Sequence, residues 1–181
     1  MTAGRLIAVV GPSGMCKDSI MTAMAARDPG LQLVRRVITR APELGGEDYD
    51  SVTVPTFRKM AADGAFCVHW RAHDLHYGIP MQILSDVRDG GCVLANFSRK
   101  ALRRAAEVFP TVKVLNITAT PNVISARLMA RGRETTDEVA ARLAVAQKPL
   151  PKGFDVATIS NDGPLEEAVA AALKAIQPVR G

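Results

Sequence analysis

The sequence has few aromatic residues, three cysteines and no long apolar run. Aromatic side chains make up 4% of the 181 residues, so few rings are present to stack on the bases of single-stranded nucleic acid. No block of about five or more like charges occurs. The net charge of +5 and the pI near 9.4 therefore favour small polyanionic ligands, such as multiphosphate substrates, over nucleic acid as partners.

The cysteines indicate a reducing compartment. Cys16, Cys67 and Cys92 are odd in number and widely spaced, and they lack the paired C-x-x-C spacing of zinc or redox sites. The apolar run at residues 6–10 is too short for the core of a signal peptide, and no stretch approaches membrane-spanning length. We expect a cytoplasmic protein that does not bind membranes.

The most informative stretch follows that apolar run and reads Gly11, Pro12, Ser13, Gly14, Met15, Cys16, Lys17, Asp18, Ser19. A strand, a glycine-rich turn and the start of a helix predict a phosphate-binding loop. In such a loop, backbone N–H groups and the positive end of the helix converge on an anion, and a lysine adds a formal charge. The alternative is an ordinary turn with a surface lysine, which is less favoured because every part falls in order.

Two positions depart from the usual phosphate-loop pattern G-x-x-x-x-G-K-[ST]. Cys16 stands where the second glycine is expected, and Asp18 replaces the hydroxyl residue that usually meets Mg²⁺. A cysteine side chain crowds the β-phosphate or tilts the loop, because glycine is what lets the backbone approach phosphates closely. The sequence leaves open whether this change is tolerated or weakens ATP binding.

Runs of β-branched residues alternate with segments of helical spacing along the chain. Residues 31–38 and 112–117 read as buried strands, and 80–89 and 164–176 read as helices. This alternation predicts an α/β fold of three layers, a mainly parallel sheet with helices on both faces and ligands at the carboxyl ends of the strands.

We expect a single domain over residues 1–181. Its core would be 1–34 and 80–181, with a small insert at 35–79 that binds the acceptor and a lid region at 131–146. Within the insert, residues 41–54 have the composition of a polar loop.

All three histidines and the only tryptophan gather in one stretch, His69, Trp70, Arg71, His73 and His76. Three clustered histidines suggest a metal site, but no H-x-x-x-H spacing and no partnered cysteine or carboxylate accompanies them. Contact of these histidines with a sugar or phosphate, or a plain surface position, is favoured over metal binding.

Three arginines follow a predicted helix near residue 131. Arg131 and Arg133 flank Gly132, and Arg142 lies on the next helix, whose start is predicted by the capping-box spacing of Thr135 and Glu138. A mobile lid at this point would bring guanidinium groups onto a transferred phosphoryl group. The alternative for Arg142 is an i,i+4 pair with Glu138 on a solvated face.

Taken together, these motifs resemble the guanylate kinase family over nearly the whole chain. The resemblance rests on the phosphate loop, the Thr39-Arg40 and Glu47-Asp48-Tyr49 segment, the Tyr77-Gly78 turn, the Arg131-Gly132-Arg133 lid with Arg142, and Asn161-Asp162. It implies that Arg40, Tyr49 and Tyr77 hold the acceptor phosphate. It also implies that Lys17, Arg131, Arg133 and Arg142 act in catalysis, and that Asn161 and residues 11–19 bind ATP.

The guanine-reading positions of that family do not match this sequence. Val68, Ala95 and Phe97 stand where guanylate kinases carry acidic side chains, and Glu43 replaces a second phosphate-binding arginine. A site that reads an N–H donor with a carboxylate loses orders of magnitude in discrimination when the carboxylate becomes apolar. The resemblance therefore implies a phosphorylated acceptor other than guanylate.

The ribose 1,5-bisphosphate phosphokinases of phosphonate utilisation resemble the sequence more fully. The shared segments are Lys17-Asp18-Ser19, His69 to His73, Gly132-Arg133-Glu134 and Asn161-Asp162-Gly163. This likeness implies transfer of the ATP γ-phosphoryl group to the 1-phosphate of ribose 1,5-bisphosphate, with Mg²⁺ held by Asp18. We expect His69 and His73 to contact the acceptor. Cys16 departs from these relatives as well, since they carry glycine there.

Two other functions stay open at this point. A nucleoside monophosphate kinase is disfavoured by Val68, Ala95 and Phe97, and a non-catalytic binding module is disfavoured because Lys17 and the lid arginines are present. The sequence leaves the oligomeric state open between a monomer and a homodimer.

Overall fold

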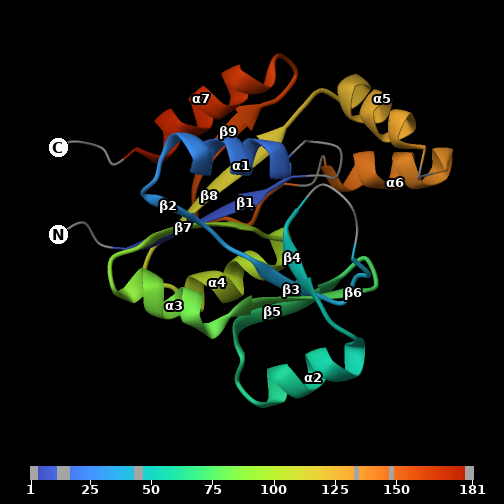
Figure 1. Ribbon diagram of the computed structural model, residues 1–181. Coiled ribbons are helices and arrows are strands. Elements are labelled where there is room, and N and C mark those ends of the chain that lie inside the picture. Colours follow the sequence, from blue (N-terminus) through green and yellow to red (C-terminus); the bar gives the residue numbers. More distant parts are fainter. Residues whose placement is uncertain (1–3, 12–16, 43–46, 133–134, 147–148, 178–181) are drawn as a thin grey trace.

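The computed structural model describes residues 4–11, 17–42, 47–132, 135–146 and 149–177 (Figure 1). Its strands are β1 (Arg5–Val10), β2 (Leu31–Leu33), β3 (Arg36–Ile38), β4 (Tyr49–Ser51), β5 (Phe66–Ala72), β6 (Leu75–Pro80), β7 (Cys92–Asn96), β8 (Val112–Thr118) and β9 (Asp155–Ser160). Its helices are α1 (Lys17–Arg27), α2 (Val54–Ala62), α3 (Met81–Arg88), the 3-10 helix η1 (Arg99–Ala101), α4 (Leu102–Val108), α5 (Pro121–Arg131), α6 (Thr136–Ala146) and α7 (Leu165–Ile176).

The main sheet has the strand order β2-β7-β1-β8-β9, and every neighbouring pair in it is parallel. Its central strand β1 is buried on both faces. Successive side chains of a strand point to opposite faces, so Ile7 and Val9 join one apolar cluster while Leu6, Ala8 and Val10 join the other. Helices α1 and α7 cover the first face, and α3 and α4 cover the second (Figure 1). The predicted parallel sheet with helices on both faces is confirmed.

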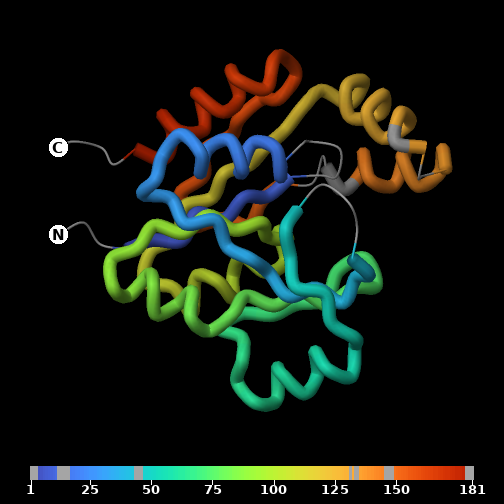
Figure 2. The backbone as a smooth tube through the Cα atoms, viewed as in Figure 1, coloured from blue at the N-terminus to red at the C-terminus, as the bar shows by residue number. Residues whose placement is uncertain are grey.

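A second sheet has the order β4-β3-β6-β5, with β3 and β4 parallel and the other pairs antiparallel. One face packs toward the main sheet through Val68, Trp70, Tyr77 and Ile79. The other face is covered by α2, whose Phe57 stacks on Phe66. Figure 2 shows the chain leaving the main sheet after β2, building this second sheet, and returning through α3.

The predicted buried strand at residues 31–38 is wrong, because those residues form β2 and β3 in two different sheets. Arg35 at the break is exposed, and Arg36 is buried in an ion pair with Glu47, so the segment is not a continuous apolar strand. The predicted polar loop at 41–54 also contributes β4 to the second sheet. The predicted acceptor-binding role of residues 35–79 stays a prediction.

Side-chain caps fix the starts of two helices, α2 and α6. Thr53 caps α2 by accepting a hydrogen bond from the backbone N–H of Thr56 at 3.3 Å. The capping box at α6 is confirmed: the Thr135 N–H donates to Glu138 Oε2 at 2.7 Å, and the Glu138 N–H donates to Thr135 Oγ1 at 3.2 Å. Local sequence signals therefore determine where α6 begins.

The phosphate loop starts at the carboxyl edge of the main sheet. Gly11 has a φ of +153°, and a Cβ atom there would lie 2.3 Å from the carbonyl oxygen of Ile117 on β8. Only glycine fits that approach. Asn96 and Asn116, at the ends of the flanking strands β7 and β8, pair in register with Val9 and Val10. Two amides thus flank the start of the loop.

Candidate active site

Lys17 is the first residue of α1, and its ammonium group turns back toward the carboxyl edge of the main sheet. Its Nζ donates a hydrogen bond to the Gly11 carbonyl oxygen at 2.7 Å. Residues 12–16 lie outside the described residues, so the predicted contacts of Pro12, Ser13, Gly14, Met15 and Cys16 with ATP stay predictions. Lys17 thus ties the two described ends of the loop together and lies where a phosphate would be received.

The surroundings of Lys17 disfavour its charged form. Burial and the nearby positive charge of Arg36 together lower the pKa of Lys17 from 10.5 to about 8, while Asp18 acts in the opposite direction. A lysine with such a pKa is poised to gain from an arriving polyanion, because phosphate oxygens would stabilise the charged form.

Asp18 faces the end of β7. The Asn96 side-chain amide donates to Asp18 Oδ1 at 3.4 Å. Burial and the negative charge of Glu47 raise the pKa of Asp18, and Lys17 acts in the opposite direction. Within the described residues, Asn116 Oδ1 is buried without a hydrogen-bond partner. A carboxylate at the carboxyl edge of the sheet is among the donors that Mg²⁺ prefers.

Asn161 lies at the end of β9, on the side of the site predicted to bind ATP. It is buried, its N–H donates to the Thr118 carbonyl at 2.7 Å, and its own carbonyl accepts from Arg127 Nη2 at 2.7 Å. Asp162 Oδ1 accepts the N–H of Thr120 at 2.8 Å, which fixes the start of α5. Asn161 therefore joins β8, β9 and α5 at the carboxyl edge of the sheet.

The structure brings Arg40, Tyr49 and Tyr77 together as the predicted acceptor side. The Arg40 guanidinium lies 4.6 Å from the centroid of the Tyr49 ring, and its Nε donates to Tyr49 Oη at 3.2 Å. The Tyr49 hydroxyl in turn donates to the Ala41 carbonyl at 2.6 Å. Burial raises the pKa of Tyr77, while the charges of Arg36, Arg40 and Arg142 lower it. The positive charges of these three arginines therefore act on the Tyr77 hydroxyl.

Arg36 and Glu47 are site residues that the sequence did not predict. The side chains are 6% and 12% exposed, and Glu47 accepts from both Nε and Nη2 of Arg36. The pair lies between the two halves of the site, since its charges act on the pKa values of Lys17, Asp18 and Tyr77. One signal was available: a charged residue within an apolar run must find a buried partner.

The two predicted acceptor-binding histidines lie in different places. His73 is in the turn between β5 and β6. Burial and the charges of Arg142 and Lys17 lower the pKa of His73, so it faces the other site residues. His69 lies on the opposite face of the second sheet, where its ring packs against Phe57 at 6.2 Å between centroids. The structure does not bring His69 to the other predicted site residues.

The predicted lid arginines are only partly described. Arg133 lies outside the described residues, and Arg131 ends α5 before Gly132, which caps that helix in the left-handed conformation with φ +65°. Arg142 lies on α6, close enough to His73 and Tyr77 for its charge to act on both pKa values. In the described chain, Glu138 serves the capping box at Thr135. The roles of the three arginines in phosphoryl transfer stay predictions.

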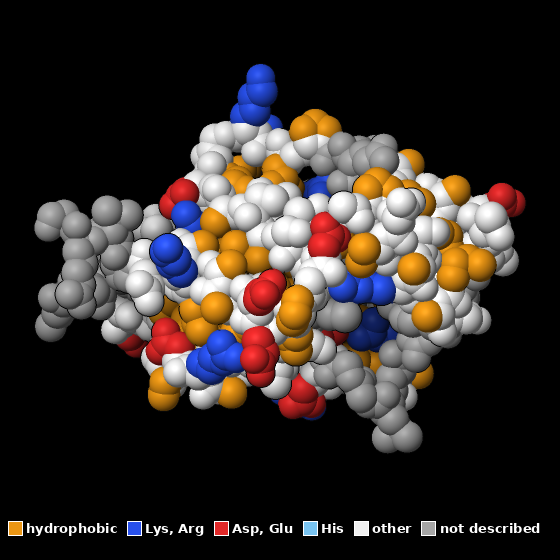
Figure 3. All heavy atoms as spheres, turned by 90° about the horizontal axis from the view of Figure 1, so that it is seen from above, with side chains coloured by type: hydrophobic (Ala, Val, Ile, Leu, Met, Phe, Trp, Pro, Cys, Tyr) orange, Lys and Arg blue, Asp and Glu red, His pale blue; other side chains and the backbone are white. Residues whose placement is uncertain are grey.

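Other chemistries find little support in the described residues. They contain no group of three or more His, Cys, Asp or Glu residues placed to hold a metal ion, and none of their helices is long and apolar enough to cross a membrane. On the face seen from above, Lys and Arg side chains alternate with Asp and Glu rather than forming one basic block (Figure 3). Burial raises the pKa of the Cys67 thiol to about 11, which favours the protonated thiol over the reactive thiolate.

Curated relatives match this chain over almost its full length. A model of the guanylate kinase family matches residues 3–178. The ribose 1,5-bisphosphate phosphokinase PhnN of Ruegeria sp. (strain TM1040) is 48% identical over 179 residues, which cover 98% of this chain and 94% of that protein. The protein of the same name from Agrobacterium fabrum (strain C58 / ATCC 33970) is 40% identical and covers 97% of this chain and 98% of its own.

Solved structures share the fold at lower identity. The guanylate kinase of Anaplasma phagocytophilum superposes with a TM-score of 0.66 at 18% identity, covering 96% of this chain and 83% of that one. A sugar kinase from Janibacter sp. HTCC2649 gives a TM-score of 0.58 at 17% identity, covering 94% of this chain and 93% of that one. The predicted guanylate kinase-like fold of the P-loop class is confirmed.

Proposed function

The chain belongs to the guanylate kinase family, and on that premise we propose that it transfers the γ-phosphoryl group of ATP to the 1-phosphate of ribose 1,5-bisphosphate. The products are 5-phosphoribosyl 1-diphosphate and ADP. The relatives at 48% and 40% identity are both ribose 1,5-bisphosphate phosphokinases by name, which supports this assignment.

The composition of the acceptor side carries the proposal. Arg40 and Arg142 act on Tyr77, so positive charge is present for a phosphorylated acceptor. Val68 and Ala95 are 1% and 0% exposed and apolar. A phosphate-binding site without groups that read a base fits a sugar phosphate better than a nucleotide.

Phosphoryl transfer requires an aligned acceptor and positive charge on the transferring group more than covalent chemistry from the protein. An oxygen of the 1-phosphate forms a bond to the γ-phosphorus as the bond from that phosphorus to the ADP oxygen breaks. Lys17 holds the phosphates of ATP, and Arg40 with Tyr49 holds the acceptor phosphate. Arg131, Arg133 and Arg142 neutralise the charge of the transferring group once the lid region closes.

We propose Mg²⁺ as the accompanying ion, held by Asp18 together with phosphate oxygens of ATP. Mg²⁺ is usually bound through one or two carboxylates plus substrate phosphates rather than by an all-protein cage. This agrees with the described residues, where the Asp18 carboxylate lies at the carboxyl edge of the sheet and accepts a hydrogen bond from Asn96. Bound there, the ion would neutralise negative charge on the phosphates.

The proposal is tested by offering acceptors separately. Purified protein is incubated with Mg-ATP and either ribose 1,5-bisphosphate, guanylate or other monophosphates, and the products are followed by ³¹P NMR. We expect a new diphosphate on C1 of the sugar, formed in equal amount to ADP. Turnover with guanylate alone rejects the proposal and favours a nucleoside monophosphate kinase.

The absence of turnover with every acceptor, together with specific peptide or nucleic-acid binding, would favour a binding module instead. We infer that the protein acts in the cytoplasm on small molecules and not on nucleic acid. The unpaired thiols of Cys67 and Cys92 support a reducing compartment. A monomer or a homodimer is equally compatible with this function.

A further inference from the structure

Four side chains form one continuous stack between the two sheets. The guanidinium of Arg36 on β3 lies 4.7 Å from the centroid of the Tyr77 ring on β6. Tyr77 stacks on Trp70 of β5 with centroids 5.6 Å apart and an interplanar angle of 11°. Trp70 stacks on Phe97, directly after β7, at 4.9 Å and 24°. The stack therefore runs from the second sheet to the end of a main-sheet strand.

The stack is buried, and two of its four members are held by hydrogen bonds. Arg36, Tyr77, Trp70 and Phe97 are between 3% and 8% exposed. Glu47 holds Arg36 through two hydrogen bonds, and the Trp70 indole N–H donates to Ser98 Oγ at 3.0 Å. Because these side chains are closely packed and Arg36 and Trp70 are held in place, no gap as thick as an aromatic ring is left between them.

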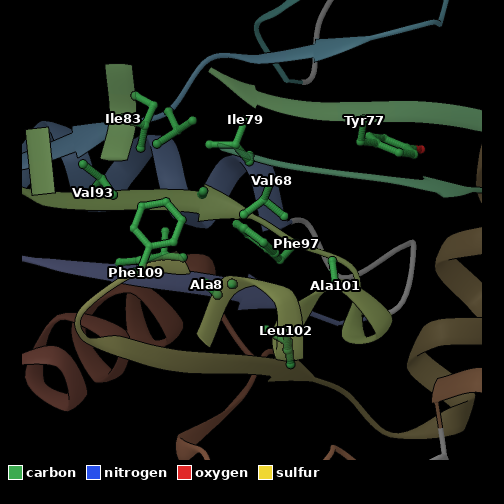
Figure 4. Packing of buried hydrophobic residues seen from close by; sticks show 14 of the residues in the cluster. Ala8, Val68, Tyr77, Ile79, Ile83, Val93, Phe97, Ala101, Leu102 and Phe109 are labelled. Carbon is green, nitrogen blue, oxygen red and sulfur yellow. The ribbon is translucent and has the colours of Figure 1, made fainter. Parts of the chain in front are cut away.

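The stack borders the acceptor side of the site. At one end, the charges of Arg40 and Arg142 act on Tyr77. At the other end, Phe97 follows Asn96, which donates to Asp18. Figure 4 shows Val68 between Ile79 and Phe97, so apolar side chains fill the space behind the stack.

We propose that this stack excludes planar nucleobases from the acceptor side, so that only a sugar phosphate without a base is accepted. The inference rests on the proposed function and adds the means of selection. A base entering here would have to displace an anchored ring, and it would meet no hydrogen-bond partner on Val68, Ile79 or Phe97. Specificity arises from a clash with the wrong acceptor as well as from contacts with the right one.

Two ligands that differ by a base provide the test. Ribose 5-phosphate and guanosine 5′-monophosphate share the sugar phosphate, and only the second carries a purine. Their binding is measured by calorimetry with a saturating non-hydrolysable ATP analogue present, so that the donor side is filled. Trp70→Ala and Phe97→Ala remove one ring each. Phe57→Ala is the matched control, because it removes a buried ring on the opposite face of the second sheet.

We expect wild-type protein to bind guanosine 5′-monophosphate at least about tenfold more weakly than ribose 5-phosphate. At least one stack variant should gain about tenfold or more in affinity for the nucleotide, with a change below about threefold for the sugar phosphate. Phe57→Ala should show no gain. Phe97→Leu, a smaller deletion, is included in case the alanine variants fail to fold, as checked by circular dichroism.

Equal affinity of the wild type for the two ligands overturns the proposal. So does an unchanged nucleotide affinity in every folded stack variant, or an equal gain in Phe57→Ala. Turnover of ribose 1,5-bisphosphate by the wild type tests the proposed function by itself. A gain of nucleotide binding in the stack variants would therefore support exclusion of bases even if that turnover were absent.

Discussion

The two sheets of this protein handle polar chemistry in different ways. The buried side chains of the main sheet are aliphatic, and the polar side chains of Lys17, Asp18 and Asn96 lie at its carboxyl edge. The second sheet has polar groups inside its packing, where Arg36 and Glu47 form a buried ion pair over Tyr77.

This difference separates activity from stability in one half of the site and couples them in the other. An edge residue of the main sheet can be removed without disturbing the core beneath it. A polar residue of the second sheet takes part in packing, so its removal affects both folding and binding. Five predictions test this contrast.

Lys17→Ala should lower turnover by about 10³-fold or more, because a charge on the transferring phosphates is lost. The unfolding midpoint in urea should stay unchanged or rise, since burial already disfavours the ammonium form. Lys113→Ala is the control. Lys113 forms a 2.8 Å ion pair with Asp155, and this pair lies at the end of the strands opposite to the carboxyl edge. Wild-type rates of ADP formation in Lys17→Ala would remove this residue from the mechanism.

Arg36→Ala should lower the free energy of unfolding by about 3–5 kcal/mol, because it leaves the Glu47 carboxylate buried and unpaired. The adjacent Arg35 is the matched control. It pairs with Asp48 and Asp50, but its side chain is 47% exposed, so Arg35→Ala should barely move the urea midpoint. Equal midpoints for the two variants would contradict the contrast between buried and exposed ion pairs.

ATP affinity should fall as the pH rises through 8. The pKa of Lys17 is lowered from 10.5 to about 8, so above this pH the free protein loses the charge that phosphates require. Between pH 7 and 9 we expect a loss of up to about tenfold. Calorimetry in buffers of different ionisation enthalpy should show proton uptake on binding near pH 8. In Lys17→Ala this pH dependence and this proton uptake should be absent.

The same shift has the opposite effect on the stability of the unliganded protein. The unfolded chain keeps the Lys17 proton up to a pKa of 10.5, so between pH 8 and 10.5 the unfolded state binds more protons than the folded state. The contribution of Lys17 to the free energy of unfolding therefore rises with pH across this window. The difference between wild type and Lys17→Ala in urea titrations isolates it.

Substitutions in the turn between β5 and β6 should stabilise the protein and at the same time weaken its activity. His73 and Asp74 have φ values of +52° and +60°, as both central residues of a type I′ turn require. Replacing them by Asn and Gly should raise the free energy of unfolding by about 1–2 kcal/mol, because Gly and Asn adopt this conformation with less strain. The Michaelis constant for the acceptor should rise several-fold because the imidazole is lost.

Asp74→Gly alone is the matched variant for that turn, since it relieves strain and keeps His73. It should gain stability without raising the Michaelis constant for the acceptor. If both variants have the wild-type Michaelis constant, His73 does not contact the acceptor.

The main sheet could be predicted from the sequence because its signals are local. The apolar run before Gly11 defines β1, and the pair of Thr135 and Glu138 defines the start of α6. Each signal lies within a few residues of the structure it determines.

The second sheet could not be predicted in the same way, because β3 and β4 have only 3 residues each and the contacts of Arg36 and Trp70 are remote in sequence. Arg36 finds Glu47 only after β3 and β4 have come together, and Phe97 meets Trp70 across 26 intervening residues and two sheets. The position of His69 depended on which face of β5 it occupies. Sequence period alone does not determine that face until the strand register is known.

Trp70 is the only tryptophan of the chain, and it lies in the middle of the stack that borders the acceptor side. Its indole is 8% exposed and donates a hydrogen bond to Ser98. The tryptophan emission of the unlabelled protein therefore comes from one place, and ligands or pH changes that disturb Tyr77 should alter its intensity and wavelength. The protein carries its own optical probe of acceptor binding, and Tyr77→Phe would calibrate it.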